Sequence, residues 1–287
     1  MEAGGRATQD AKVESREEGV KEMTMHFNTI KLEQDPRGYA TLWLDRVEKH
    51  NAFNAEMIEE LLGVFEHLQQ DDKLRFLILR GRGKHFCAGA DLQWMRQSAE
   101  LDYTGNLRDA EAMAEIMYRL YQLPMPTLAV VQGAAFGGAI GLIACCDMAI
   151  GADDAQLSLS EVRIGLAPAV ISPFVVKAIG ERASRRYAIS GERFSGERAG
   201  ELGLLMESCP AAELEQRQER WAATLLQNSP QAMRASKALV HAATAHRLPP
   251  ELRHYTQQSI VQIRASDEGR EGIHAFLEKR EPRWVQE

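Results

Sequence analysis

The stretch VVQGAAFGGAIGLIACCDMAI, residues 130–150, decides the fold. It has the pattern of a buried strand, a glycine-rich turn, an apolar helix and a second strand. The turn contains Gly133, Gly137 and Gly138, whose missing side chains let another group approach the backbone closely. That group could be a nucleotide phosphate, a reacting carbonyl or a packed helix, and the rest of the sequence helps to choose among them.

The glycine spacing excludes the common nucleotide loops. Residues 133–141 follow the pattern G-x-x-x-G-G-x-x-G, whereas a dinucleotide-binding turn needs G-x-G-x-x-G directly after a strand. A phosphate loop of the G-x-x-x-x-G-K-[ST] type fails because Gly83-Lys84 is followed by His85. The G-x-S-x-G motif of a hydrolase nucleophile is also absent from the sequence. Taken alone, the turn is best explained by tight packing of the helix that follows it.

The elements expected before this stretch alternate between strands and helices. Hydrophobic periodicity predicts strands at 30–32, 40–44 and 76–79, a helix capped by Asn54, and another helix across 113–120. Such alternation, continued to about residue 210, predicts an α/β fold with parallel strand pairs.

The chain changes character after this region. From Ala211 onward the strand patterns disappear, and helices are expected near Leu214, at Pro230 after a Ser229 cap, and at Pro250. We therefore place the one internal boundary at this point.

A second turn of small residues, Cys87-Ala-Gly-Ala-Asp91, follows the strand at 76–79 and leads into a helix expected to begin near Asp91. Helix N-termini carry unpaired N–H groups, and their dipoles favour negative charge. Two such turns can aim backbone N–H groups at one point, which makes an oxyanion hole. This second turn favours the reacting carbonyl.

The composition limits the possible partners. A net charge of −7 over 287 residues opposes nucleic acid as the main partner, because phosphate binding needs a basic surface. No apolar run reaches the roughly 18 residues that span a bilayer. The four cysteines lack metal-ligand spacing, which is typical of buried thiols in a reducing compartment. Residues 1–24 are polar, with no signal-peptide core, and we expect a disordered extension.

Three motifs carry a specific resemblance to a known family. They are HFCAGADL at 85–92, QGAAFGGA at 132–139 and LSEVRIGLAP at 159–168. In this order and spacing they resemble the enoyl-CoA hydratase/isomerase (crotonase) family, from about Phe27 to Trp284. Within the family, the sequence is most similar to bacterial methylglutaconyl-CoA hydratases, also called gamma-carboxygeranoyl-CoA hydratases, which act in leucine or isoprenoid catabolism.

The resemblance implies a fold and an assembly. We expect a crotonase-type spiral of β-β-α turns over residues 25–210 and a C-terminal helical trimerisation region over 211–287. The expected assembly is a homo-trimer or homo-hexamer in the cytoplasm. No separate cofactor and no metal are expected, because CoA is part of the substrate.

The resemblance also implies the site residues. The oxyanion donors are the N–H groups of Ala90 and Gly138, and Glu161 is the catalytic carboxylate. The residues expected along the CoA or the acyl group are Lys49, Ala88, Asp91, Leu92, Arg163, Phe276 and Lys279. Of these, Phe276 and Lys279 would reach the adenine end of a CoA bound to a neighbouring subunit. Two local basic clusters, one at 46–50 and one at 80–84, are further candidates to attract the CoA phosphates.

One position departs from the family pattern. Hydratases of the family generally carry a first glutamate three residues after the oxyanion glycine, and this chain has Gly141 there. A single carboxylate can still serve a hydratase if it takes a proton from the attacking water and returns it to the substrate. We expect the volume freed at Gly141 to admit a branched acyl group or an ordered water. Arg163 is the candidate cation for a substrate carboxylate, because burying an unpaired anion is unfavourable.

The sequence therefore predicts an acyl-CoA hydratase, which is a hydro-lyase, acting on a branched, carboxylate-bearing enoyl-CoA. The first alternative keeps the fold and changes the reaction to an enoyl-CoA isomerase that uses Glu161 alone. The second alternative is a non-enzymatic binder, for example of RNA, which the acidic charge and the retained Glu161 oppose.

Overall fold

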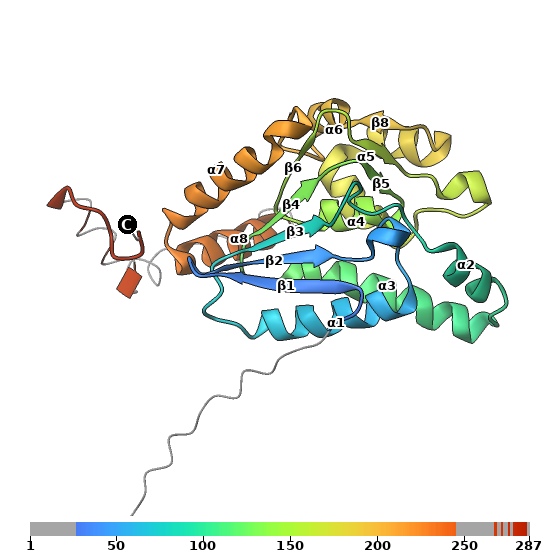
Figure 1. The fold of residues 1–287 in the computed structure, drawn as a ribbon, viewed down its shortest axis with the longest axis horizontal. Coiled ribbons are helices and arrows are strands. Elements are labelled where there is room, and N and C mark those ends of the chain that lie inside the picture. The colour runs from blue at the N-terminus through green and yellow to red at the C-terminus, as the bar shows by residue number, and fades with distance from the viewer. Residues whose placement is uncertain (1–26, 245–266, 269–270, 272–274, 276–277, 286–287) are drawn as a thin grey trace, which may run out of the picture.

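A computed structural model describes residues 27–244, 267–268, 271, 275 and 278–285 (Figure 1). The predicted N-terminal extension, the helix expected at Pro250 and the side chain of Phe276 lie outside these residues. The described chain is an α/β structure, as predicted, with one large sheet, one small sheet and helices packed around both.

The large sheet has six strands, in the order β1-β2-β3-β4-β6-β9. Their bounds are Ile30–Asp35, Tyr39–Leu44, Leu77–Gly81, Thr127–Val131, Met148–Ala152 and Glu207–Cys209. β1 and β2 form an antiparallel hairpin, and each later pair is parallel. The predicted parallel pairing is therefore confirmed. β4 is buried along its whole length, as expected for a strand covered on both faces.

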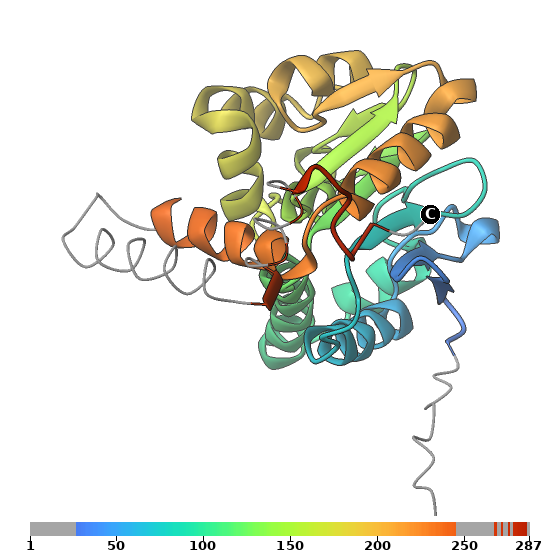
Figure 2. The same cartoon turned by 90° about the vertical axis from the view of Figure 1, so that its left-hand side faces the viewer.

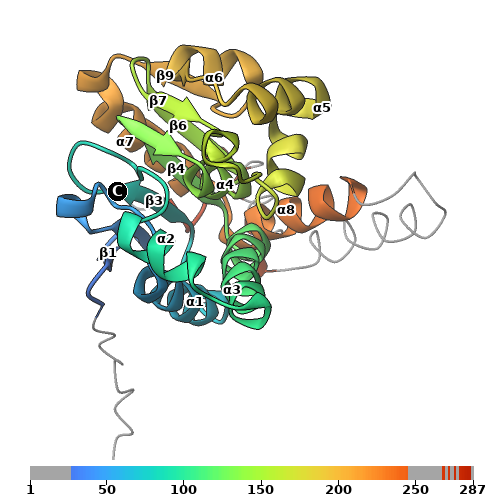
Figure 3. The same cartoon turned by 90° about the vertical axis from the view of Figure 1, so that its right-hand side faces the viewer.

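Helices α1 (Ala55–Gln69) and α3 (Tyr103–Gln122) pack together on one side of this sheet. Figure 2 and Figure 3 show the two helices side by side at one end of the molecule. The side chain of Asn54 accepts a hydrogen bond from Met57 N–H at 2.9 Å, so the predicted cap of α1 is confirmed. The apolar face of α1 lies in the core, with Met57 and Leu61 fully buried.

The quoted stretch forms one element more than the pattern predicted. A short strand, β5 (Ala134–Phe136), lies within the predicted turn, before α4 (Gly138–Cys145) and β6. β5 belongs to the small sheet with β7 (Gln156–Ser158) and β8 (Phe194–Ser195). Three residues are too few to show a period in the sequence, so only the partner strands reveal β5.

The remaining elements complete the molecule. They are η1 (Val47–Lys49), α2 (Leu92–Ala99), η2 (Glu161–Ile164), α5 (Ser172–Ser190), α6 (Gly196–Leu202), η3 (Ala211–Glu213), α7 (Leu214–Leu226) and α8 (Pro230–Thr244). The described residues contain no strand after β9, and α7 and α8 begin where the sequence predicted. None of the described helices combines the length and the apolar character needed to cross a bilayer.

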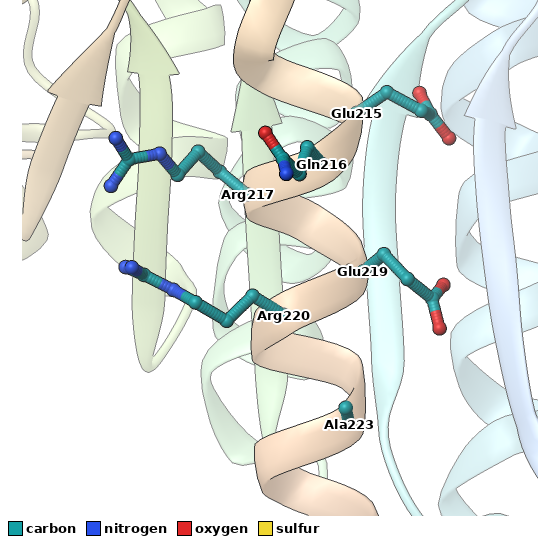
Figure 4. Close-up of a pocket in the computed structure, with 6 residues that line it drawn as sticks. All are labelled: Glu215, Gln216, Arg217, Glu219, Arg220 and Ala223. Atoms are coloured by element: carbon teal, nitrogen blue, oxygen red, sulfur yellow. The ribbon is translucent and has the colours of Figure 1, made fainter.

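Both late helices pack against the rest of the molecule. α7 lies over the strands of the large sheet, which run behind it in Figure 4. Glu215 of α7 pairs with Arg80 of β3 at 2.7 Å. α8 is held at the end of α3, where His241 stacks on Tyr121 with ring centroids 4.4 Å apart. α7 and α8 are therefore joined to the core through these contacts.

Candidate active site

The first small-residue turn presents one free backbone donor. Phe53 N–H donates to the Gly89 carbonyl at 2.8 Å, and Asp91 N–H donates to the Phe53 carbonyl at 2.8 Å. Ala90 lies between these two bonds, paired with Phe53 as in a parallel ladder, so its own N–H points away from Phe53. Within the described chain that N–H has no acceptor, and Ala90 is exposed.

The second turn presents another free donor. Gly137 has a φ of +56°, which favours glycine, and its N–H donates to the Ser158 carbonyl at 2.9 Å. Gly138 is the first residue of α4, so its N–H has no partner within the helix. No other acceptor for it occurs among the described residues.

The two turns lie against each other. Cys87 and Ala135 form a parallel bridge, in which Cys87 N–H donates to the Ala134 carbonyl at 3.1 Å. The Phe53 ring reaches the second turn, since a Cβ added to Gly138 would lie 3.2 Å from its Cε2. The residue that holds Ala90 in place therefore also contacts Gly138, and the two free donors belong to one site.

Glu161 is the carboxylate at this site. It begins η2, and a Cβ added to Gly137 would lie 3.1 Å from its Oε1. Its Oε2 is buried and has no hydrogen-bond partner within the described chain. Burial raises the pKa of Glu161, and a hydrogen bond from its own backbone N–H only partly offsets this effect. A carboxylate with a raised pKa beside an oxyanion site is suited to exchange protons.

Asp91, which the sequence placed along the CoA, makes its contacts within the protein. Its Oδ1 caps α2 by accepting from Gln93 N–H at 2.8 Å, and its Oδ2 lies 3.0 Å from Arg46 Nη2. Burial acts to raise the pKa of Asp91, but the hydrogen bonds from Gln93 and Arg46 overcome it and hold the pKa below its ordinary value. The side chain is almost fully covered, so these contacts describe a structural carboxylate.

The expectation of free volume at Gly141 is wrong. A Cβ at this position would lie 2.2 Å from Ile171 Cγ2 and 3.1 Å from Met117 Cε. Ile171, just before α5, fills the space that a larger residue at position 141 would need. The pocket gains neither acyl volume nor a water from this glycine. The sequence could not show this, because Ile171 lies 30 residues away along the chain.

Three of the proposed CoA residues, Lys49, Ala88 and Leu92, lie next to the first turn, whereas no contact of the described residues brings Lys279 to it. Lys49 ends η1 and is exposed, and the Ala88 N–H donates to the His50 carbonyl at 3.0 Å. Leu92 begins α2 with 72% of its surface exposed, which is unusual for leucine and leaves an apolar side chain beside Ala90. Lys279 is exposed, in the C-terminal part of the described chain.

The arginines of the two basic clusters are engaged in ion pairs, so only part of each cluster is available to attract phosphates. Arg46 pairs with Asp91, and Arg80 pairs with Glu215. Arg82 pairs with Glu33 at 2.7 Å, and the guanidinium groups of Arg80 and Arg82 both lie over the Trp43 ring. Lys49 and Lys84 are the cluster members that stay exposed without an ion pair among the described residues.

Two surface hollows lie away from this site. One, of about 450 Å³, lies at the carboxyl ends of the large-sheet strands and is lined by Arg80, Lys84, Asp154 and Glu215 among others. The other, of about 700 Å³, lies over α7 (Figure 4). Its charged residues are neutralised by neighbours, as in the ion pair of Arg220 with Glu207 at 2.9 Å. Neither hollow is lined by Ala90, Gly138 or Glu161.

Arg163 is oriented by a backbone carbonyl. Its Nε donates to the Gly191 carbonyl at 2.9 Å, and Ser158 Oγ donates to the same oxygen at 3.0 Å. The carbonyl of Ser158 in turn accepts the N–H of Gly137, so three hydrogen bonds in a row link Arg163 to the second turn. The two Nη atoms of Arg163 have no acceptor within the described chain.

One side chain near the site was not recognised from the sequence. His85 has no identifiable partner in the sequence pattern, yet its Nδ1 accepts the Ala134 N–H at 3.0 Å. The signal lay in the quoted motifs, because both residues precede an oxyanion turn by a few positions.

Comparison with known proteins finds similarity over most of the chain. A family model described as enoyl-CoA hydratase/isomerase matches residues 34–287. A solved enoyl-CoA hydratase from Shewanella pealeana is 43% identical, with a TM-score of 0.85 over 90% of this chain and 96% of that one. Hydroxycinnamoyl-CoA hydratase-lyase from Pseudomonas fluorescens is 35% identical over 74% of this chain and 77% of its own. A trans-2-decenoyl-acyl-carrier-protein isomerase from Streptococcus mutans is 30% identical over 91% of this chain and 99% of its own.

Proposed function

Because the chain belongs to the enoyl-CoA hydratase/isomerase family, we propose that it adds water across the 2,3 double bond of an enoyl-CoA. The protein is an enzyme of the hydro-lyase type. The observation that carries the proposal is the Glu161 carboxylate over the Gly137–Gly138 turn, with a buried, unpartnered Oε2 beside two free backbone donors.

The backbone donors act on the thioester. Its carbonyl oxygen would accept hydrogen bonds from the N–H groups of Ala90 and Gly138. These bonds polarise the carbonyl and so withdraw electron density from the conjugated C3 atom. When the nucleophile adds, negative charge develops on this oxygen, and donors that are already in place stabilise it without reorganising. The exposed Ala90 and the half-buried Gly138 leave this oxygen position accessible.

Glu161 moves the proton. As a carboxylate it removes a proton from water, whose oxygen forms a bond to C3 while the C2–C3 π electrons become the enolate. The protonated Glu161 then returns the proton to C2, and the thioester carbonyl is restored. All atoms of one water enter the product. Burial favours this cycle, because the raised pKa makes Glu161 a stronger base than an exposed glutamate and lets it hold the proton briefly.

Isomerisation is the second candidate reaction, and the packing at Gly141 favours it. Ile171 fills the space beside Gly141, so Glu161 would act without a second carboxylate from α4. A single carboxylate can carry a proton from C4 to C2 of a 3-enoyl-CoA, which moves the double bond without water. The similarity to a decenoyl isomerase supports the same possibility.

An absorbance assay separates the two reactions. Hydration of a 2-enoyl-CoA removes the conjugated thioester absorbance, whereas isomerisation of a 3-enoyl-CoA creates it. We expect loss of absorbance with 2-enoyl thioesters, and a mass increase of one water. Turnover of 3-enoyl thioesters alone would replace the hydratase with the isomerase, and no turnover of either class would reject both.

We further propose that the acyl group is branched and carries a distal carboxylate, as in methylglutaconyl-CoA. The support is Arg163, whose Nε is held by Gly191 while its two Nη atoms are without partners in the described chain. A planar guanidinium oriented in this way can bind a carboxylate through two parallel hydrogen bonds.

Replacing the cation tests this substrate class. Arg163→Met should lower kcat/KM for a glutaconyl-type thioester by about 10- to 150-fold, the value of one charge-assisted hydrogen bond. The neutral crotonyl-type thioester, used as the matched control substrate, should change far less. Equal losses on both substrates would show that Arg163 supports the fold through Gly191 and does not bind the substrate.

A further inference from the structure

His85 connects the beginnings of the two turns that carry the oxyanion donors. Its Nδ1 accepts the N–H of Ala134 at 3.0 Å. His85 precedes the Cys87–Asp91 turn, and Ala134 begins β5, which leads directly into Gly137 and Gly138. Ala134 is buried, so water has little access to this N–H if the imidazole is removed.

Among the described residues, no backbone carbonyl accepts the Ala134 N–H. In the parallel pairing of the two segments, Phe136 N–H donates to the Cys87 carbonyl. Two residues earlier on each segment, the same pattern would pair the Ala134 N–H with the His85 carbonyl. That carbonyl is already used by Asn51 Nδ2 at 2.8 Å. The imidazole therefore supplies the acceptor at the point where the ladder is interrupted.

The contact is close, and Gly133 makes it possible. A Cβ at Gly133 would lie 2.1 Å from the Lys84 carbonyl oxygen and 2.7 Å from His85 Nδ1. Gly133 also has a φ of +59°, which L side chains rarely adopt. Gly133 thus lets the His85 loop pack closely against the turn, whereas Gly137 and Gly138 form the donor site.

We propose that His85 is a positioning residue for the reaction: its imidazole, by accepting the Ala134 N–H, sets the register of the two turns so that Ala90 and Gly138 converge on one oxygen. This inference rests on the proposed function, because it concerns the same oxyanion site. The effect on rate follows from geometry, since a displacement of about 1 Å at a catalytic group can cost about 100-fold in turnover.

The surroundings keep the imidazole in the accepting form. Nδ1 can accept only when it carries no proton. Burial lowers the pKa of His85, and the nearby His50 and Lys84 lower it further. The His50 ring meets His85 edge to face, with centroids 4.9 Å apart. These effects favour the neutral imidazole, and the bond at Nδ1 places its proton on Nε2.

Substitution of His85 by asparagine or glutamine distinguishes the effect of the Nδ1 hydrogen bond from that of the imidazole ring. Asparagine places its Oδ1 near the position of His Nδ1, whereas glutamine places its amide near Nε2. We expect His85→Ala and His85→Gln to lower kcat by about 10- to 100-fold. His85→Asn should retain kcat within about 3-fold of the wild type, because it restores the acceptor. The affinity for a saturated acyl-CoA should change little in all three variants, because the loss is confined to the transition state.

His67→Asn is the matched control. His67 is an exposed histidine in the last turn of α1, outside both turns. Its turnover should stay near that of the wild type. Equal losses in His67→Asn and His85→Ala, or failure of His85→Asn to recover turnover while it melts like the wild type, would overturn the inference.

Amide hydrogen exchange at Ala134, followed by NMR, tests the bond without any assay of turnover. Protection should be lost in His85→Ala and His85→Gln and kept in His85→Asn. If the wild type hydrates no enoyl-CoA, the proposed function fails while this exchange pattern still stands. If the wild type is active and Ala134 stays protected in His85→Ala, the inference about His85 fails and the function survives.

Discussion

Two carboxylates lie beside the two free backbone donors, and their surroundings differ. Asp91 follows Ala90, and its oxygens accept from backbone N–H groups and from Arg46. Glu161 lies over Gly137, and its Oε2 has no partner within the described chain. The pKa of Asp91 is lowered by its hydrogen bonds against the effect of burial, whereas burial raises the pKa of Glu161.

In the proposed reaction, this difference separates a structural carboxylate from a reactive one. Hydrogen bonds to a charged carboxylate stabilise the charged form and hold it in one place. A carboxylate without such bonds binds a proton more readily and keeps its oxygens available for water or substrate. Under the proposed function, one acid fixes the donor turn and the other stays free to exchange protons. The predictions below test this contrast, beginning with the largest expected effect.

Neutralising the reactive carboxylate should have the largest effect. Glu161→Gln keeps the shape of the side chain and removes the base, so kcat should fall by about 100- to 10,000-fold. Steady-state turnover of an enoyl-CoA measures the loss, and calorimetry with a saturated acyl-CoA should show little change in affinity. Glu181→Gln, at an exposed glutamate of α5, is the control. Normal turnover in Glu161→Gln would show that Glu161 is not the base and would contradict the distinction between the two carboxylates.

Blocking the Gly138 N–H should have the second-largest effect. Gly138→Val adds a branched side chain where even a Cβ would meet the Phe53 ring at 3.2 Å. We expect kcat to fall by about 100- to 1,000-fold, as for loss of one oxyanion donor. Gly200→Val, at a helical glycine with open space, controls for the added bulk. Wild-type turnover in Gly138→Val would show that the thioester oxygen does not bind there.

Neutralising the structural carboxylate should act on stability. Asp91→Asn keeps an oxygen for the α2 cap but leaves Arg46, a largely buried guanidinium, without its charged partner. The free energy of unfolding should fall by about 1.5–3 kcal/mol, the value of a hydrogen bond to a charged group. Urea denaturation of the variant and the wild type measures the difference. If the stability is unchanged, the Arg46 pair does not stabilise the turn.

The smallest effect concerns the stability of Glu161→Gln itself. The fold binds the proton of Glu161 more tightly than the unfolded chain does, because burial raises the pKa of this carboxyl above its ordinary value of 4.5. The protonated carboxyl therefore adds its full contribution to stability below pH 4.5. That contribution is lost as the pH rises through the pKa of Glu161 in the folded protein. At pH 7 the wild type has lost it, so Glu161→Gln should melt higher by about 1–3 °C.

Melting curves between pH 4 and pH 8 provide the measurement. The advantage of Glu161→Gln should vanish toward pH 4, where the wild-type carboxyl is neutral as well. Over the same range the turnover of the wild type should rise with pH, because only the carboxylate can take the proton of water. A variant that melts lower than the wild type at pH 7 would contradict the raised pKa.

The sequence predicted most of the fold because the relevant signals are local. The caps by Asn54 and Ser229 and the start of α2 at Asp91 depend on neighbours within a few residues, and the structure has them as expected. The alternation of strands and helices gave the parallel sheet for the same reason. The short strand β5 was missed because its stability comes from β7, about 20 residues further along the chain.

Wrong expectations arose where a distant residue decides the outcome. The side chain of Ile171 fills the space beside Gly141. The charge of Arg80 is neutralised by Glu215 in α7, 135 residues away. A sequence shows that a glycine lacks a side chain or that an arginine is charged. It does not show which other segment takes up that space or that charge, because burial and pairing are properties of packed segments.

The sequence by itself therefore determined the alternating elements, the two glycine-bearing turns and the carboxylate that follows them, since short-range patterns encode each of these. Only the tertiary structure decided which backbone donors stay free and which carboxylate stays without partners. It also decided that His85 rather than a carbonyl receives the Ala134 N–H. Hydrogen-bond partners are assigned when all segments compete for the same donors and acceptors, and that competition takes place only in the folded chain.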